Sequence, residues 1–213
     1  MLFQSREEAA KLLAERLNQY RGQNPLVLGI PRGAVPMARI IAEALDGEVD
    51  VVLAHKLGAP GNPEFAIGSI SEKGDVYLSD SVQRIGISRD YIAREAKAQI
   101  GTLRHRRTLY TPVRAAIDPA DRIVIVVDDG IATGATMIAA LRAVRAVRPT
   151  KLIAAAAVAP PEVVERIAKE ADEVVCLEVP RGFYAVGQFF RDFSQVTDED
   201  VMAILQTSGG IPI

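Results

Sequence analysis

Tryptophan is absent from the 213 residues of this chain, cysteine occurs once and histidine twice. One cysteine, Cys176, excludes an internal disulfide framework, and its place in an apolar strand-like run predicts a buried thiol in a reducing compartment. The two histidines, His55 and His105, are far apart in the sequence and show no spacing typical of zinc ligands. A disulfide scaffold and a zinc site are therefore not expected.

Excess positive charge and long apolar segments are missing as well. The net charge is -2 and the isoelectric point is near 5.8, so the chain has no overall basic surface for binding a phosphate backbone. No apolar stretch is long enough to span a bilayer, and the N-terminus does not resemble a signal peptide. We expect a cytoplasmic protein that binds neither nucleic acid nor membrane.

Strand-like and helix-like segments alternate along the chain. Hydrophobic residues make up 49% of it, which is enough for one sizeable core and predicts a single domain over 1–213, with a disordered tail at 206–213. Strands are expected at 25–30, 49–54, 122–127, 151–159 and 173–179, and helices at 6–20, 36–45, 89–110, 136–147 and 161–171. This alternation predicts an α/β fold whose parallel sheet is covered on both faces by helices.

The segment after the second expected strand has a different composition. Gly and Pro are frequent in "HKLGAPGNPEF", so a loop is expected to begin at His55. Two short apolar runs, 66–71 and 75–79, are expected to form an antiparallel pair outside the main sheet, because no helix-length connection separates them.

The stretch "VVDDGIATGAT" places two carboxylates, Asp128 and Asp129, at the end of an expected strand. Open parallel sheets bind ligands beyond the carboxyl ends of their strands, and two carboxylates there suit a diol or a magnesium ion. The turn from Gly130 to Thr136 supplies backbone N–H groups, two hydroxyls and the positive end of a helix, which together favour phosphate. The combination predicts a ribose 5-phosphate ligand.

Other interpretations of this stretch fit the residues less well. Asp-Gly also marks hairpins, and carboxylates often end strands because they prefer turns, but an Ala-rich helix follows here instead of a second strand. A Walker phosphate loop needs Lys where Ala135 stands, and the dinucleotide fingerprint needs another glycine spacing. A phosphohydrolase with Asp128 as nucleophile needs a further acid where Gly130 stands.

The segment "IVIVVDDGIATGATM" resembles, at every motif position, the ribose-phosphate loop of type I phosphoribosyltransferases. The resemblance implies a parallel sheet of about five strands flanked by helices, with a small hood and a flexible arm. It also implies that Asp128 and Asp129 hold the ribose 2- and 3-hydroxyls of 5-phosphoribosyl 1-pyrophosphate (PRPP) and Mg²⁺, directly or through water. The 5-phosphate would be wrapped by Gly130, Ile131, Ala132, Thr133, Gly134, Ala135 and Thr136.

Two further segments match the pyrophosphate-binding parts of this family. "GIPRGAVPMA" corresponds to its short pyrophosphate loop, with Arg32 and Gly33 as binding residues and a cis peptide expected between them. "AHKLG" places Lys56 against the pyrophosphate, and we count Lys56 with the two acids as catalytic. In "LRHRRTLY", Arg106 and Arg107 either stabilise a helix C-terminus or belong to an arm that closes over the pyrophosphate.

The segment "LEVPRGFYAVGQFFRDF" resembles the base-binding segment of hypoxanthine-guanine phosphoribosyltransferases. Phe183 or Tyr184 would stack on the base and Asp192 would contact the base or the magnesium, although a core aromatic cluster is an alternative. Ala132 stands where those enzymes carry an acid, and "AAAAVAPP" has no lysine to bind the exocyclic oxygen. Oxopurine specificity is therefore not expected.

The resemblance implies an enzyme of nucleotide salvage, a pentosyltransferase that uses PRPP and Mg²⁺ and releases pyrophosphate. Its partners would be PRPP and a small-molecule acceptor that is neutral and nucleobase-like, with a homodimer left open. Glu64 is a candidate proton acceptor. The rival hypothesis is a PRPP-binding regulator without activity, although neither an added DNA-binding module nor a basic RNA-binding face is evident.

Overall fold

The computed structural model describes residues 2–72, 74–78, 82 and 85–208. Five parallel strands form the central sheet in the order β2-β1-β6-β7-β8. Their bounds are Glu48–Val51 for β2, Leu26–Gly29 for β1, Ile123–Asp128 for β6, Lys151–Val158 for β7 and Glu173–Glu178 for β8. The predicted five-stranded parallel sheet is confirmed.

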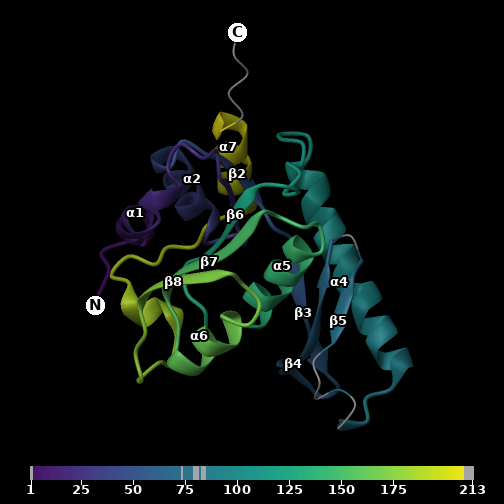
Figure 1. Ribbon diagram of the computed structural model, residues 1–213. Helices are drawn as coiled ribbons and strands as arrows, with labels where there is room; N and C mark the ends of the chain where they lie inside the picture. Colours follow the sequence, from purple (N-terminus) through teal and green to yellow (C-terminus); the bar gives the residue numbers. More distant parts are fainter. Residues whose placement is uncertain (1, 73, 79–81, 83–84, 209–213) are drawn as a thin grey trace.

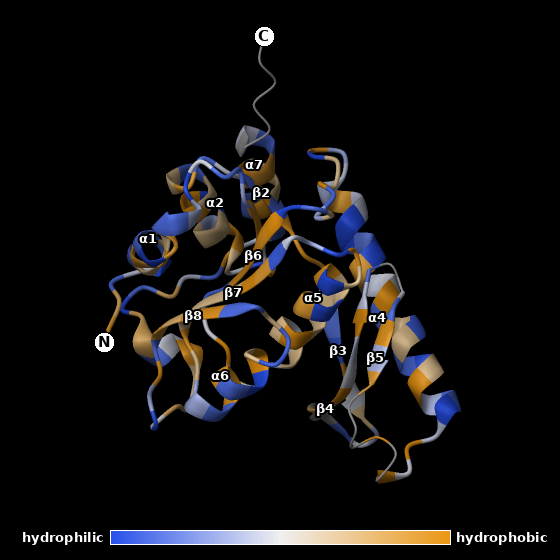
Figure 2. Cartoon of the chain, viewed as in Figure 1, coloured by the Kyte–Doolittle hydropathy of each residue, from blue (hydrophilic) through white to orange (hydrophobic). Residues whose placement is uncertain are grey.

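Helices cover both faces of this sheet, as Figure 1 shows. Helices α1 (Arg6–Arg16) and α2 (Val35–Ala44) pack on one face, and α5 (Ala135–Arg145) and α6 (Pro161–Ile167) on the other. Alternate strand residues face the two layers: Val27 and Ile125 belong to the α1–α2 core, and Leu28 and Val126 to the α5–α6 core. Figure 2 shows the apolar strands enclosed between helices whose outer faces are polar.

A second sheet lies beside the first and corrects the loop expected from His55. Strands β3 (Ala54–Ala59), β4 (Asn62–Ser71) and β5 (Val76–Leu78) form an antiparallel sheet in that order. The predicted β4–β5 pair is confirmed, but the Gly-rich stretch before it is a hairpin. The glycines of this stretch are needed by the hairpin itself, because the register shifts at Gly58 and Gly61 turns with φ +73°. Farther along β4, a Cβ on Gly68 would lie 2.4 Å from the Tyr77 carbonyl of β5.

The antiparallel sheet packs against α4 (Arg89–Tyr110), the long charged helix expected from the sequence. Buried Leu57, Ile70 and Leu103 share a third core with Val201 and Leu205 of a C-terminal helix, α7 (Asp198–Ser208). This last helix was not predicted. Residues 206–208, where a disordered tail is expected to begin, belong to this helix, and 209–213 lie outside the described residues.

The N-terminal residues meet residues 189–192 over the carboxyl edge of the sheet. The Phe3 N–H donates to the Phe189 carbonyl at 2.8 Å, and the Arg191 N–H donates to the Phe3 carbonyl at 2.9 Å. The Phe3 and Phe190 rings are 5.4 Å apart and tilted by 37°. The segment 183–194, which contains the short helix η2 (Val186–Phe189), and residues 2–6 are together called the hood.

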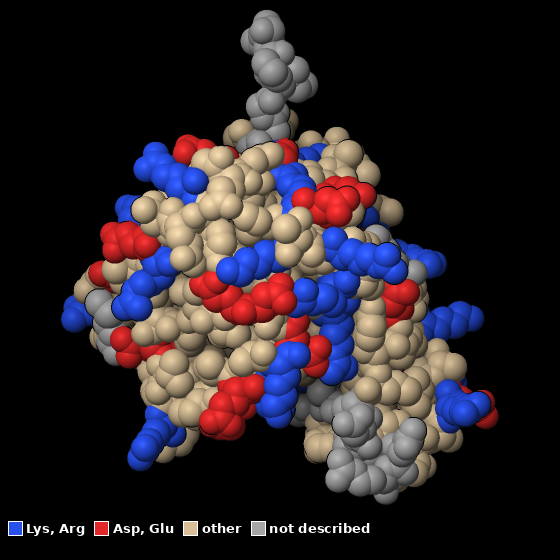
Figure 3. Space-filling model, in the orientation of Figure 1, with Lys and Arg blue, Asp and Glu red and all other residues tan. Residues whose placement is uncertain are grey.

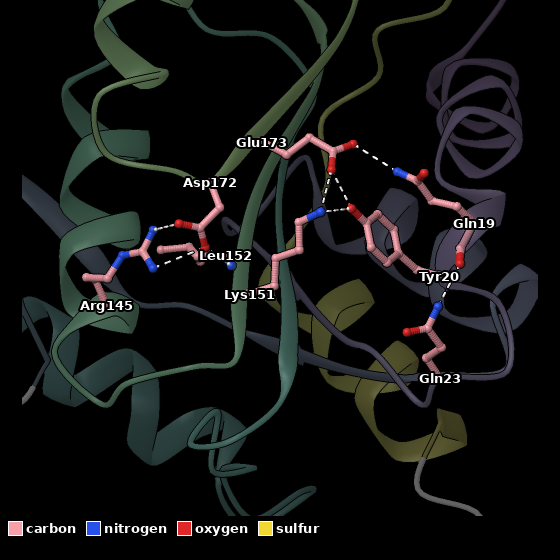
Figure 4. Close-up of polar contacts among 8 residues, drawn as sticks. All are labelled: Gln19, Tyr20, Gln23, Arg145, Lys151, Leu152, Asp172 and Glu173. Atoms are coloured by element: carbon pink, nitrogen blue, oxygen red, sulfur yellow. Dashed lines mark hydrogen bonds and ion pairs between the residues drawn. The ribbon is translucent and has the colours of Figure 1, made fainter.

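The amino ends of β7 and β8 are joined by a polar cluster (Figure 4). Lys151 Nζ donates to Tyr20 Oη at 2.5 Å and to Glu173 Oε2 at 2.9 Å, and Tyr20 donates to the same carboxylate. Burial raises the pKa of Glu173, but the hydrogen bonds from Tyr20 and Lys151 outweigh it and lower the pKa below its usual value. The charged carboxylate therefore stabilises this edge of the sheet.

Charged side chains of both signs alternate on the face shown in Figure 3. One such pair joins α5 to the start of β8: Arg145 Nη2 lies 2.8 Å from Asp172 Oδ1. Among the described residues, no helix is both long and apolar enough to cross a membrane.

Candidate active site

The site lies where the order of the parallel strands reverses. From β1 the chain crosses to β2 on one side, while β6 lies on the other side of β1, so the loops after β1 and β6 meet at one edge of the sheet. The two loops lie very close together: a Cβ built on Gly33 would lie only 2.3 Å from Asp129 Oδ2. The two segments that the sequence singled out, "PRGA" and "DDGIATGAT", are thus brought together.

Asp128 and Asp129 stand side by side at the end of β6. The Asp129 N–H donates to Asp128 Oδ1 at 2.9 Å, which orients the first carboxylate. Desolvation, followed by the negative charge of Asp129, raises the pKa of Asp128 well above its usual value. Two carboxylates this close favour a bound proton, a cation or hydroxyl groups that donate to them.

Arg6, at the start of α1, supplies a positive charge to this acid pair. Its Nε lies 2.7 Å from Asp129 Oδ2 and its Nη1 donates to the Ser194 carbonyl at 2.7 Å. Its guanidinium carbon is 3.9 Å from the centre of the Phe193 ring. Arg6 thus connects the hood to the acids. The sequence held no local signal for this contact, because Arg6 is 123 residues from Asp129.

The loop after the acids is shaped by glycines and by contacts from other elements. Gly134 has φ +77°, a left-handed conformation that glycine adopts without strain, and stands at the N-cap of α5. Arg166 on α6 donates to the Thr133 carbonyl at 2.6 Å, while Ala132 and Thr133 are exposed. A Cβ on Gly130 would lie 2.3 Å from Val186 of the hood. The loop therefore has a fixed backbone and an open outer surface.

Comparisons with known proteins agree with this geometry. A family model described as "Phosphoribosyl transferase domain" matches residues 2–192. A Mycobacterium tuberculosis H37Rv protein, provisionally named a phosphoribosyl transferase, is 43% identical over 206 residues, which are 96% of this chain and 46% of that protein. The chain belongs to the type I phosphoribosyltransferase family. It spans about half the length of the curated relatives that it matches.

Solved structures extend the comparison. A Thermus thermophilus protein is 47% identical to this phosphoribosyltransferase-family chain, with a TM-score of 0.90, and the match covers 99% of this chain and 100% of that one. An Aquifex aeolicus protein at 16% identity, with a TM-score of 0.50 and coverage of 82% and 72%, is similar in fold alone.

The predicted pyrophosphate loop of this family member differs in one detail from what was expected. The cis peptide joins Pro31 to Arg32, one residue earlier than expected. Arg32 Nη1 lies 3.5 Å from Asp198 Oδ2 on α7, and Arg106 Nε lies 4.0 Å from Asp198 Oδ1. Tyr110 also donates to Asp198 Oδ1, at 2.5 Å. Two of the predicted pyrophosphate-binding arginines are therefore neighbours, held by an acid that lies beyond the residues matched by the family model.

Arg107 is held elsewhere. Its Nε and Nη2 donate to Glu72 at 2.6 and 2.8 Å, and its Nη1 lies 3.8 Å from Asp50 Oδ1. Its guanidinium therefore faces two carboxylates, because α4 carries successive residues on different sides, and its contact with pyrophosphate stays a prediction. Only Arg106 lies beside Arg32.

Lys56 does not lie in a loop after the second parallel strand, where the sequence placed it. It lies inside β3, where it is paired with Ser69 of β4. Its carbonyl contacts the Nδ1 atom of His55 at 2.7 Å. Glu64 lies on β4, and the structure describes only its backbone. The roles of Lys56 and Glu64 stay predictions.

The segment predicted to bind the base forms part of the hood. Phe183 packs on the core and stacks on Phe189 with ring centres 5.5 Å apart, whereas Tyr184 is 92% exposed. Asp192 Oδ1 accepts the Ser194 N–H at 3.1 Å, and the hydrogen bonds from Ser194 lower the pKa of Asp192. Of the two aromatics, Tyr184 is the more exposed, and half-buried Phe183 matches the alternative of a core cluster.

The donor set at the acids suits a magnesium ion that is shared with a ligand. No group of three or more His, Cys, Asp or Glu side chains that could hold a metal occurs within the described ranges. Mg²⁺ is commonly bound by one or two carboxylates together with substrate phosphates and water. Asp128 and Asp129 provide such a partial set, so they fit an ion that arrives with a phosphate-bearing ligand.

Proposed function

We propose that this protein transfers the phosphoribosyl group of PRPP to a neutral aromatic acceptor and releases pyrophosphate. The observation that carries the proposal is the adjacency of the diol-binding acids, Asp128 and Asp129, to the phosphate loop and to Gly33 of the pyrophosphate loop. A ligand with a diol, a 5-phosphate and a pyrophosphate needs these three parts at one edge of the sheet.

Each part of the site has a distinct role in this proposal. Asp128 and Asp129 accept hydrogen bonds from the ribose 2- and 3-hydroxyls, and the N–H groups of residues 132–136 bind the 5-phosphate, since the Ile131 N–H already donates to the Val158 carbonyl. When the ribose diol binds, Arg6 either keeps its ion pair with Asp129 beside the hydroxyls or turns its guanidinium toward the ligand. Arg32 and Arg106 bind the pyrophosphate and stabilise the charge that develops on it as it leaves. A magnesium ion held with PRPP by the two acids would add further positive charge there.

The acceptor is proposed from the exposed end of the hood. Tyr184 offers an aromatic face for stacking, and Ala132 places no acid beside the loop. A neutral base fits these surroundings better than anionic orotate. Guanine and hypoxanthine are expected to be poor acceptors, because Ala132 cannot share a ring-nitrogen proton. Nucleotide salvage in the cytoplasm is the proposed setting.

Calorimetry with PRPP and Mg²⁺ tests the binding step. We expect heat from the native protein and from the exposed control variant Asp90→Asn, and at least a tenfold weaker affinity for Asp128→Asn/Asp129→Asn. Equal affinities for all three proteins would contradict the proposal.

Release of pyrophosphate with a panel of nucleobases then tests the reaction. Tight PRPP binding without release by any base would favour the regulator over the enzyme.

A further inference from the structure

Arg6 is held by contacts from three different parts of the chain. Its Nη1 donates to the Ser194 carbonyl at 2.7 Å, and its guanidinium carbon lies 3.9 Å from the centre of the Phe193 ring. Its Nε lies 2.7 Å from Asp129 Oδ2, and its Nη2 lies beside the loop after β1, where a Cβ on Gly33 would be 3.2 Å away. Because the side chain is only 14% exposed, these contacts fix its orientation.

The contact between Arg6 and Asp129 uses a single carboxylate oxygen. Arginine often binds a carboxylate through two parallel hydrogen bonds, one to each oxygen. Here only Nε donates to Asp129, at Oδ2, because Nη1 is directed to the Ser194 carbonyl. The loop after β1 packs against the same oxygen, since a Cβ on Gly33 would lie 2.3 Å from it. Asp129 Oδ2 is thus fixed, and the direction of Asp129 Oδ1 is fixed with it.

Two oxygens of the acid pair are left for a ligand. The Asp129 N–H donates to Asp128 Oδ1 at 2.9 Å. Within the described part of the chain, no hydrogen bond reaches Asp128 Oδ2 or Asp129 Oδ1, and neither belongs to the buried polar atoms without a partner. Two neighbouring acceptors, each on its own carboxylate, match two neighbouring hydroxyl donors.

We propose that Arg6 is a positioning residue for the ribose. By holding Asp129 Oδ2, it directs Asp129 Oδ1, together with Asp128 Oδ2, at the 2- and 3-hydroxyls, and it thereby determines the preference for ribose over 2-deoxyribose. The inference rests on the proposed function, in which the two acids bind the diol. In this role Arg6 keeps its ion pair with Asp129 when the ligand binds and acts on the ribose through that carboxylate.

A matched pair of sugar phosphates tests the role, with calorimetry on the full chain at constant Mg²⁺. We expect the native protein to bind ribose 5-phosphate at least about tenfold more tightly than 2-deoxyribose 5-phosphate, because the deoxy sugar leaves one charged acceptor without its donor. Arg6→Gln should reduce this preference to about threefold or less, mainly by weakening the binding of ribose 5-phosphate. Arg6→Lys keeps the charge and one contact to Asp129, so its preference should be intermediate.

A purely structural role of Arg6 would give a different result. Loss of hood or helix stability would weaken the binding of both sugar phosphates alike and leave the preference at its native value. Urea unfolding of each variant measures this stability separately. Arg16→Gln, at an exposed arginine of the same helix, is the matched control and should keep the native preference.

Three results would overturn the inference alone. They are equal binding of the two sugars by the native protein, a native preference in folded Arg6→Gln, and an equal loss of preference in Arg16→Gln. If Arg6→Gln does not fold, an unchanged preference in Arg6→Lys has the same meaning.

Failure of the proposed function has a different signature. The native protein would bind neither sugar phosphate, or Asp128→Asn/Asp129→Asn would bind both as the native protein does. Either result would overturn the diol-binding role of the acids, and the role of Arg6 with it.

Discussion

Asp129 is the residue at which distant parts of the chain converge. Gly33 approaches it from the loop after β1 and Arg6 from the first helix. A residue with no side chain and a residue with a long one thus share a single carboxylate. The contact with Gly33 leaves no room for even a methyl group, because the added carbon would lie 2.3 Å from an oxygen.

Gly33→Ala is therefore expected to displace the Asp129 side chain and weaken PRPP binding at least tenfold. Gly101→Ala is a suitable control, because a Cβ there meets nothing within 4 Å and alanine in a helix interior is about 0.5–1 kcal/mol more stable than glycine. Calorimetry gives the affinity and urea unfolding gives the stability. Unchanged PRPP affinity in Gly33→Ala would show that the two loops do not act together.

The residues recognised from sequence were those that carry a local pattern. Asp128, Asp129 and Gly134 belong to one continuous motif, and the structure places them at one strand end. Arg6 and Asp198 could not be found in this way, since each acts on a partner far along the chain. The separation of Arg106 from Arg107 depends on how α4 is rotated in the fold, which a run of four basic residues does not define.

Among the secondary-structure elements, β7 and β8 depend on the cluster of Tyr20, Lys151 and Glu173 at their amino ends (Figure 4). The pKa of Glu173 is lowered from its usual 4.5 in the folded protein. Its contribution to stability is therefore present above pH 4.5 and is lost as the pH falls through the lower, folded value.

Glu173→Gln is expected to reduce the free energy of unfolding by about 1 kcal/mol at pH 7, the size of a partly exposed ion pair with hydrogen bonds. The difference from the native protein should shrink as the pH is lowered from 7 to 4 and below. Urea unfolding at a series of pH values measures it, with the exposed Glu165→Gln on α6 as control. A difference that stays constant with pH would contradict the assignment.

Helices with a capping residue and a clear helical period of apolar residues were predictable from the sequence. Elements that depend on tertiary contacts were not. Ser5 caps α1, accepting the Glu8 N–H at 3.4 Å, as the sequence predicted. Helix α7 has a similar signal that was overlooked, because Thr197 and Asp200 cap each other through their side chains and N–H groups. The hairpin β3–β4 was hidden by its Gly and Pro content, since bulges and turns use the same residues as loops.

At the scale of the whole molecule, residues 2–6 and the segment 183–194 pair with each other over the acid pair. Residues 2–6 would not cover the acids unless the C-terminal segment paired with them, as the bridge between Phe3 and Phe190 does. Arg6 is positioned through this pairing, because it also bonds to Ser194. The stability of the hood and the geometry of the acid pair are thus linked.

Phe3→Ala is expected to lower the free energy of unfolding by about 3–5 kcal/mol, the usual cost of removing a fully buried phenyl ring. PRPP affinity should also fall, because Arg6 loses its support. Leu2→Ala, next to it but 48% exposed, is the matched control and should change neither quantity. Denaturant unfolding and calorimetry measure the two effects. A loss of folding stability without a loss of PRPP affinity would show that the hood does not determine the geometry of the acid pair.

The exposed ring of Tyr184 also gives the protein an optical property. The chain has five tyrosines and no tryptophan, and two of them, Tyr20 and Tyr110, are buried and donate to carboxylates. Because phenylalanine emits only weakly, the ultraviolet fluorescence of the protein is therefore dominated by tyrosine. An aromatic molecule that settles on Tyr184 will alter this emission, so the unlabelled protein can report its own acceptor.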